Sequence, residues 1–242
     1  MSNSNLVNVV ILSPNCNKRT KPISKITIHH MAGNLTVEQC GNIFKPATRK
    51  GSSNYGIGTD GRVGLYVEES NRAWTSGNAE NDQMAVTIEV ANNSGAPNWT
   101  VSNTAYAKLI DLCVDICQRN GIKQLNWTGD KRGNLTCHYM FQATACPGPY
   151  LKSHMMDIAN AVNAKLNVTT PATVIKPSAG FTPYLVKINT DVLNVRGGTG
   201  TNYPITTTVK RGQVYTIVDE VNGWGKLKSG AGYICLAYTV KV

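Results

Sequence analysis

The sequence lacks the features that mark several large classes of protein. No stretch of its 242 residues approaches the roughly 20 consecutive apolar residues of a membrane-spanning helix, so we expect no membrane span. The first residues, Met1–Asn5, have neither the basic region nor the apolar run of a secretory signal. We therefore expect synthesis in the cytoplasm without a signal peptide.

Acidic residues are scarce. The 14 Asp and Glu residues stand against 24 Lys and Arg, which gives a net charge of +10. Residues 1–166 and residues 167–242 each carry +5, so the C-terminal part is the more densely charged. A basic surface favours polyanions such as nucleic acid, an anionic membrane or a wall with anionic polymers. No basic helix, zinc-finger spacing or RNP-like aromatic motif is present, so we expect no nucleic-acid partner.

A disulfide framework is also missing. The seven cysteines are odd in number and irregularly spaced, and the chain is longer than small disulfide-rich scaffolds. Cys113 and Cys117 lie four residues apart on an expected helix. We predict that both fill the core, because a free cysteine packs as a small apolar residue.

The chain divides into two differently patterned parts. Residues 167–182, rich in Thr, Pro, Ser and Gly, are predicted to form a linker. Residues 1–166 mix strand and helix patterns, which predicts an α/β domain with a mixed central sheet flanked by helices. Residues 183–242 show short alternating strands, glycine-containing turns and no helical period. This pattern predicts a small all-β barrel.

Several elements of the first part are predicted individually. Strands are expected over the apolar or alternating segments 7–12, 26–29, 55–58, 62–67 and 85–90. Asp60-Gly61 predicts the hairpin turn between the third and fourth of these. Helices are expected after the capping-box sequence that starts at Thr36, over residues 104–120, and from Pro149 onward.

Histidine is rare, and its placement is the strongest chemical signal. The four histidines are His29, His30, His138 and His154. The first two end an apolar run that predicts a strand, and His138 opens a Gly/Pro-rich segment that contains Cys146. Two imidazoles and one thiolate form a ligand set that suits Zn²⁺. Three protein ligands describe a catalytic site, whereas a structural zinc site usually has a fourth.

A zinc hydrolase also needs a general base near the metal. Glu89 is the leading candidate, because it lies in the apolar strand Val86–Val90, where a carboxylate without a partner is costly. Its neighbour Thr87 shares its face of the strand, and Ile88 faces the other way. A surface glutamate at the end of a strand is the alternative interpretation.

Five motifs carry a family resemblance in the order in which they occur. They are Ile26–His30, Ser53–Gly61, Arg72–Trp74, Val86–Glu89 and His138–Gly148. Over about residues 20–165 the chain resembles the zinc-dependent N-acetylmuramoyl-L-alanine amidases related to peptidoglycan recognition proteins and phage amidase-type lysozymes. The resemblance implies cleavage of the amide bond between N-acetylmuramic acid and the L-alanine of the stem peptide.

The resemblance assigns roles residue by residue. It implies that His29, His138 and Cys146 are the zinc ligands. His30 then points to the opposite face of its strand, where a structural role is expected. Thr144 lies two residues before the third ligand, where the family has Lys or Thr near the scissile carbonyl. Its hydroxyl is expected to orient the substrate or to stabilise the oxyanion, with an ordinary loop threonine as the alternative.

The chain departs from the family pattern at two positions. Some members use a tyrosine before the Asp60-Gly61 turn, but that position holds Ser53 here, and Tyr55 is expected to pack in the core. This departure supports Glu89 as the base. Thr75 replaces a histidine found in many relatives, so it adds no titratable group. Trp74 is expected to line the groove, with a core position as the alternative.

The C-terminal part resembles the bacterial SH3-like repeat of cell-wall lytic enzymes. The resemblance rests on Asp191–Tyr203 and on Asn222–Leu227. It implies wall targeting, with Tyr203 and Trp224 as candidate wall-binding residues. Tethering a weak binder to a hydrolase raises the local concentration of substrate.

The expected function is therefore that of an endolysin, a peptidoglycan hydrolase of a phage or prophage. We expect it to act on a wall of the Gram-positive type after release through a membrane pore. A host autolysin or spore-associated amidase and a non-catalytic peptidoglycan-binding protein are the alternatives. The intact set His29, His138 and Cys146 argues against the non-catalytic alternative. The oligomeric state is left open.

Overall fold

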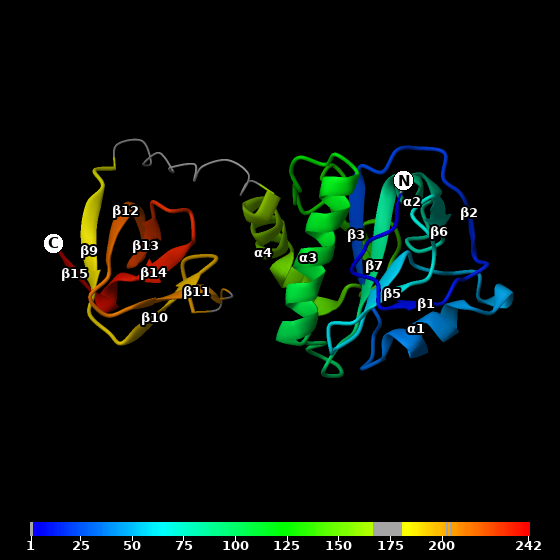
Figure 1. Ribbon diagram of the computed structural model, residues 1–242, viewed down its shortest axis with the longest axis horizontal. Coiled ribbons are helices and arrows are strands. Elements are labelled where there is room, and N and C mark those ends of the chain that lie inside the picture. Colours follow the sequence, from blue (N-terminus) through cyan, green and yellow to red (C-terminus); the bar gives the residue numbers. More distant parts are fainter. Residues whose placement is uncertain (1, 167–180, 202, 204) are drawn as a thin grey trace. The chain divides into compact units, whose positions relative to one another are not determined.

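The computed structural model describes residues 2–166, 181–201, 203 and 205–242 (Figure 1). The chain divides into two compact units, Met1–Leu166 and Asn167–Val242. Most of the expected linker, residues 167–182, lies outside the described residues. Within the described ranges, no helix combines the length and the apolar character needed to cross a membrane.

The first unit is built on a six-stranded mixed sheet with the strand order β1-β5-β4-β7-β3-β8. Its strands are β1 (Val9–Val10), β3 (Lys25–His30), β4 (Tyr55–Ile57), β5 (Val63–Leu65), β7 (Ala85–Val90) and β8 (Leu135–Cys137). The parallel pair β3 and β7 lies inside the sheet, and β4 and β5 form the antiparallel hairpin expected around Asp60-Gly61. The predicted mixed central sheet is confirmed.

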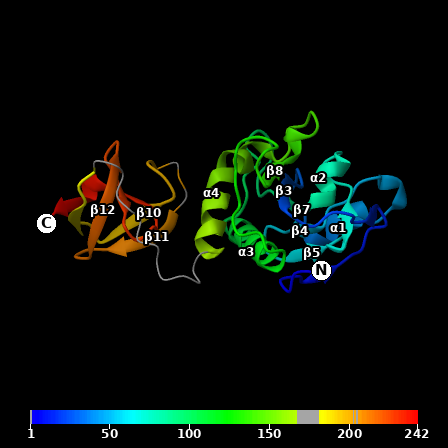
Figure 2. The same ribbon diagram turned by 90° about the horizontal axis from the view of Figure 1, so that it is seen from above.

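Helices cover both faces of this sheet (Figure 2). The long helices α3 (Asn103–Arg119) and α4 (Gly148–Leu166) pack together on one face, and their apolar stripes join the main core. On the other side lie the short helices α1 (Val37–Phe44) and α2 (Ala79–Met84). The capping box predicted at Thr36 is confirmed, because the Thr36 hydroxyl and the Gln39 side chain each accept from the other's backbone N–H.

Alternation along β3 and β7 separates the core from the polar face of the sheet. Ile26 and Ile28 of β3 are fully buried in the core with α3 and α4. Thr27 and His29 alternate with them and therefore point to the opposite face. Strand β7 repeats the pattern, with Ile88 in the core and Glu89 on the opposite face. Two adjacent strands thus carry their polar side chains to one side.

The structure departs from the predicted elements of the first unit in several places. Strand β8 and helix α2 were not predicted. The strand expected over residues 7–12 is only the two-residue strand β1, because it pairs solely along the edge of β5. A separate two-stranded sheet, β2 (Cys16–Lys18) with β6 (Asn71–Ala73), was not predicted. Both strands are three residues long and mostly polar, so they show no apolar alternation.

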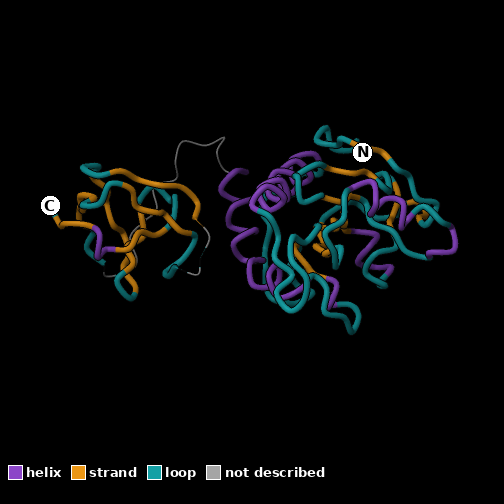
Figure 3. The backbone as a smooth tube through the Cα atoms, turned by 90° about the horizontal axis from the view of Figure 1, so that it is seen from below, coloured by secondary structure: helices purple, strands orange, loops and turns teal. Residues whose placement is uncertain are grey.

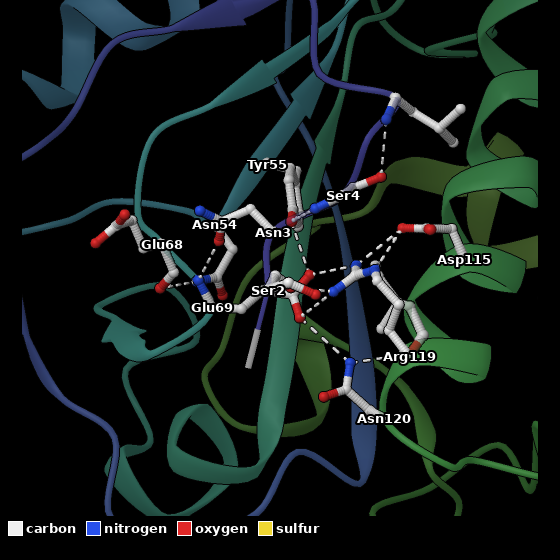
Figure 4. A network of polar contacts seen from close by, with 12 residues as sticks. Ser2, Asn3, Ser4, Asn54, Tyr55, Glu68, Glu69, Asp115, Arg119 and Asn120 are labelled. Carbon is white, nitrogen blue, oxygen red and sulfur yellow. Dashed lines mark hydrogen bonds and ion pairs between the residues drawn. The ribbon is translucent and has the colours of Figure 1, made fainter.

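The N-terminal residues are held against this unit by a buried polar network (Figure 4). The Glu69 carboxylate is fully buried and forms an ion pair of 2.6 Å with Arg119. It also accepts from the Tyr55 hydroxyl at 2.7 Å and from the Asn120 amide at 3.2 Å. Because the backbone N–H of Ser4 donates to the Tyr55 hydroxyl, the network fixes the start of the chain on the sheet.

The second unit consists almost entirely of strands and loops in its described residues (Figure 3). Its seven-stranded antiparallel sheet has the order β11-β10-β14-β13-β12-β9-β15. The strands are β9 (Tyr184–Ile188), β10 (Val192–Arg196), β11 (Ile205–Lys210), β12 (Val214–Val221), β13 (Trp224–Leu227), β14 (Tyr233–Cys235) and β15 (Thr239–Lys241). The two strands at the ends of this order, β11 and β15, were not predicted; β11 is largely exposed and shows no apolar alternation.

Candidate active site and metal centre

The register of two parallel strands creates the centre of the site. In the pairing of β3 with β7, His29 lies directly beside Glu89. Both side chains point to the polar face of the sheet, and Nδ1 of His29 lies 4.0 Å from Oε1 of Glu89. The imidazole is 1% exposed and the carboxylate 13% exposed, so both are held in a nearly dry environment.

Two further ligand candidates, His138 and Cys146, lie beside His29, although they come from the C-terminal part of the first unit. His138 begins the short 3-10 helix η2 (His138–Met140), which directly follows β8, the neighbour of β3. Its ring centroid lies 4.7 Å from that of His29. Cys146 lies at the end of the following loop, with its Sγ 3.5 Å from Nδ1 of His29. The ligand atoms of the three residues all lie within 4.8 Å of one another.

Burial favours the metal-binding form of His29 and opposes that of Cys146. It is the main reason why the pKa of His29 is well below its ordinary value, and the nearby His138 and His30 lower it further. His29 is therefore a neutral imidazole, which is the form that binds a metal. Burial also raises the pKa of the Cys146 thiol. A bound cation opposes this effect, because it stabilises the thiolate.

Two observations show that the residues fit a zinc ion: the chemistry of their donor atoms, and buried polar atoms that have no hydrogen-bond partner. Two neutral imidazoles and one thiolate suit Zn²⁺, and three protein ligands leave a coordination position for chemistry. Nε2 of His29 and Oε2 of Glu89 are buried with no hydrogen-bond partner among the described residues. An unsatisfied buried polar atom costs about 1–3 kcal/mol, so this is where a group that the chain does not supply is expected to bind.

Gln142 supports the second ligand. Its Oε1 lies 3.1 Å from Nε2 of His138, four residues earlier in the same turn. A carbonyl oxygen only accepts, so Nε2 carries the proton and Nδ1 keeps its lone pair. Such outer partners fix the tautomer and the orientation of metal-binding histidines. This role of Gln142 was not predicted from the sequence, although its four-residue spacing from His138 is a signal that could have indicated it.

The site opens into a cavity of about 450 Å³. His29, Glu89 and His138 line it together with Trp74 and Gln142. Three cationic side chains on the rim were not predicted: Arg49, Lys50 and Arg72. Arg49 ends the 3-10 helix η1 (Ala47–Arg49), Lys50 follows it, and Arg72 lies on the short strand β6, so the sequence shows no periodic pattern that would bring them together. The carboxyl groups of Asp82 and Glu89 also line the cavity, so the cationic side chains are in small excess.

Glu89 has the properties of a tunable acid–base group. Burial raises its pKa to about 8, and the charge of Arg49 opposes this shift. A carboxyl group with a pKa near neutrality can exchange protons efficiently at physiological pH. Its Oε2 has no intramolecular partner, so one oxygen is free to contact water or substrate.

Trp74 lies on the cavity wall and not in the core. It is half-buried directly after β6, and its indole Nε1 donates to Oδ1 of Asn17 at 2.8 Å. The same oxygen accepts from Nε of Arg72 at 3.0 Å. Asn17 therefore holds the indole and the guanidinium side by side. Thr144, in contrast, is exposed and outside the residues lining the cavity, and its hydroxyl accepts from the backbone N–H of Cys146 at 3.2 Å.

The two departures from the family pattern have structural explanations. Tyr55 is fully buried in the core. Thr75 lines the cavity and shares a hydrogen bond of 2.9 Å with Thr87. Asp82, a further lining residue missed in the sequence, accepts from the backbone N–H of Thr75 at 3.1 Å. The carboxylate thus holds the loop after Trp74 against the cavity.

The second unit carries its candidate residues outside the core. Ile234 and Leu227 are buried, so their strand neighbours Tyr233, Trp224 and Lys226 point outward. Cross-strand pairing places Tyr233 beside Lys226, and the ammonium lies 5.8 Å from the ring centroid. Tyr203 is half-buried, and its ring is close enough to Gly198 that a Cβ there would be 2.4 Å away.

Comparisons with known structures agree with this architecture. The Staphylococcus aureus hydrolase AmiA, solved in complex with its ligand, has a TM-score of 0.55 at 15% identity, over 67% of this chain and 84% of that chain. A mutant of PlyL gives 0.52 at 14% identity, over 65% and 98%. A mutant endolysin from Bacillus subtilis gives 0.51 at 14%, over 64% and 99%. At these identities the likeness establishes the fold.

Sequence comparison establishes the family. No curated protein sequence matches the chain. The family model described as bacterial SH3 domain matches residues 191–238, within the second unit. The family model described as N-acetylmuramoyl-L-alanine amidase matches residues 19–149, more than half of the chain and the segment that holds the whole cavity site. The protein therefore belongs to the N-acetylmuramoyl-L-alanine amidase family.

Proposed function

We propose that this amidase is zinc-dependent and uses Glu89 as its general base. The observation that carries the proposal is the pairing of His29 with Glu89 on adjacent strands at the floor of a cationic cavity. His29, His138 and Cys146 would hold the ion, which supplies Lewis acidity toward a carbonyl and lowers the pKa of a water molecule to about 7.

The residues of the chain have separate tasks in this mechanism. Glu89 takes the proton of the attacking water at its free Oε2 and returns it to the nitrogen of L-alanine as the C–N bond breaks. Burial raises the pKa of Glu89 to about 8, which leaves the carboxyl mostly protonated at neutral pH. The base therefore requires neighbouring positive charge, which favours the ionised carboxylate. Trp74 offers an amphipathic ring to the sugar, and its hydrogen bond to Asn17 fixes that ring before substrate binds.

We propose Thr144 as an auxiliary hydrogen-bond donor to a substrate that reaches its loop. Its hydroxyl accepts from the N–H of Cys146, so its own proton is free to be donated. The side chain is exposed in the loop before the third ligand. A bound substrate would therefore have to extend over this loop to receive the hydrogen bond.

Analysis of wall digests by mass spectrometry tests the reaction. We expect new N-terminal L-alanine and intact glycan strands, because the cleaved bond joins the lactyl group to the peptide. New reducing sugars without free L-alanine would refute the proposal. The Glu89→Gln variant serves as the control for contaminating hydrolases, since it should release neither product.

We further propose that the second unit targets the enzyme to the wall. The outward face of β13 and β14 carries Trp224, Tyr233 and Lys226 together, and the unit has a surplus of positive charge. An aromatic surface beside cations suits sugars or peptides attached to anionic polymers. Tyr203 lies in the turn before β11, and we propose that its half-buried ring extends this wall-binding surface.

The biological role we propose is that of an endolysin acting on a Gram-positive wall after release through a membrane pore. Support comes from the amidase family, from the bacterial SH3 match and from the fold shared with an endolysin. Expression in the cytoplasm of a Gram-positive host should leave the cells intact until a pore-forming protein is co-expressed. Lysis without the pore would contradict this route.

A further inference from the structure

The cysteine ligand lies in a segment that has few contacts of its own. Residues 142–145, which lead to Cys146, are all exposed. Pro147 and Gly148 are buried directly after it. His29, in contrast, is fixed by the ladder of a central strand. The backbone of Cys146 is held from one side by the N–H of Tyr139, which donates to its carbonyl oxygen at 3.1 Å. From the other side, its position depends on what holds the buried turn that follows it.

His30 lies against that turn from the next strand position. A Cβ built on Gly148 would lie 3.0 Å from Nδ1 of the His30 ring and 3.2 Å from Cβ of Trp99. The turn thus sits tightly between these two residues, so that a larger side chain would have to displace one of them, and the φ angle of Gly148, +82°, also favours glycine.

Asn92 fixes the orientation of the His30 ring. It is fully buried after the end of β7, and its Nδ2 donates to the carbonyl oxygen of Trp99 at 2.8 Å. Its Oδ1 therefore faces Nδ1 of His30, at 3.1 Å, and accepts a hydrogen bond from it. The indole of Trp99 meets the imidazole edge to face, with centroids 5.4 Å apart and planes at 88°.

We propose that His30, Asn92 and Trp99 form a clamp that positions Cys146 for metal binding. The proposal rests on the metal site described under the proposed function. His30 acts here as a positioning residue, through packing and through its neighbours, and it is not a ligand. Partners in the shell around a metal site typically change metal affinity by about 10- to 100-fold.

Cobalt binding by the full chain provides the test. Co²⁺ bound to a thiolate gives a sulfur-to-metal absorption that reports on Cys146 directly, and competition with a chromophoric chelator gives the affinity. We expect His30→Ala to lower the affinity by about 10- to 100-fold and to weaken this absorption. His30→Gln, which keeps a donor for Asn92, should recover part of both.

His154→Ala is the matched control. This histidine lies on α4, stacked on Tyr150 at 4.3 Å, and does not belong to the metal-binding group. Its variant should bind cobalt as the unmodified chain does. Trp99→Leu provides a second variant from an exposed loop if His30→Ala does not fold, and it should lower the affinity in the same direction.

The outcomes separate the clamp from the metal site itself. Unchanged affinity and absorption in His30→Ala or in folded Trp99→Leu overturn the clamp. An unmodified chain that binds no cobalt at all overturns the proposed metal site. If His154→Ala loses as much cobalt affinity as His30→Ala, the loss reflects a general destabilisation, and the clamp is overturned as well.

Discussion

The two units treat polar side chains in opposite ways. In the first unit, charged and polar residues such as His29, Glu69, Asp82 and Asn92 are buried. Among the described residues of the second unit, the buried side chains are apolar. The first unit gives up some stability to hold reactive groups in a dry place, whereas the second uses its interior for folding and its surface for contact. Chemistry and targeting therefore require different uses of a core.

The first unit can bury so much polarity because it satisfies nearly all of it. Arg19 illustrates this, since its buried guanidinium donates to five backbone carbonyls, including those of Glu69 and Ala85. Burial lowers its pKa to about 10, which still leaves it charged at neutral pH. Of the four buried side-chain atoms without a partner among the described residues, Nε2 of His29 and Oε2 of Glu89 lie at the proposed catalytic centre; the other two belong to Asn81 and Tyr106.

The largest effect is expected from Cys146→Ser. A ligand lost from the first unit removes both the Lewis acid and the activated water, so we expect amidase activity to fall by about 10⁴-fold or more. The control is Cys235→Ser, a half-buried free cysteine of the second unit. Equal activity of the two variants in a muropeptide assay would contradict the assignment of Cys146 as a metal ligand.

Glu89→Gln should have the next largest effect. The amide keeps the shape but cannot take a proton, so turnover should fall by about 10² to 10⁴-fold while zinc stays bound. The exposed Glu68→Gln is the matched control. Metal analysis together with single-turnover rates checks both statements, and an unimpaired rate would exclude Glu89 as the base.

Arg119→Ala tests the buried polarity of the first unit through stability. It leaves the Glu69 carboxylate buried without its cation, which should reduce the free energy of unfolding by about 3–5 kcal/mol. Arg211→Ala breaks the exposed pair with Asp191 in the second unit and should cost about 0–1 kcal/mol. Urea unfolding of both variants measures the two losses in free energy of unfolding. Equal losses would show that the two units do not differ in this respect.

The smallest effect on chemistry is expected from removing the second unit. Deletion of residues 170–242 should weaken binding to intact walls by about 100-fold, because a tethered contact is lost. Hydrolysis of small muropeptides should stay the same, since the described first unit has its own core and contains the whole cavity. Sedimentation with purified walls measures the first quantity; unchanged wall binding would assign targeting to the first unit.

Much of the fold was predictable because its signals are local. The stripe of α3, the capping box at Thr36 and the apolar strand β7 follow directly from residue spacing. The strands that were missed, β2, β6, β8, β11 and β15, are short or lack apolar alternation. Their existence depends on partners distant in the chain, which periodicity within one segment does not reveal.

The site was predictable in its chemistry but not in its surroundings. The ligand set and Glu89 came from residue type, strand alternation and a family resemblance. The roles of Gln142, Asp82 and Asn17 did not, because each depends on a hydrogen bond that only the folded chain creates. The cationic rim of the cavity was missed for the same reason.

The sequence by itself determined the amidase family, the two-part organisation and the residues His29, Glu89, His138 and Cys146 as a chemical set. Motif order, residue type and alternation carry that information, and all three can be observed along one chain. Only the tertiary structure decided that His29 and Glu89 are direct neighbours and that His30, Asn92 and Trp99 surround the turn after Cys146. Strand register and side-chain packing bring distant segments together, and the sequence of one segment does not indicate which other segment it will contact.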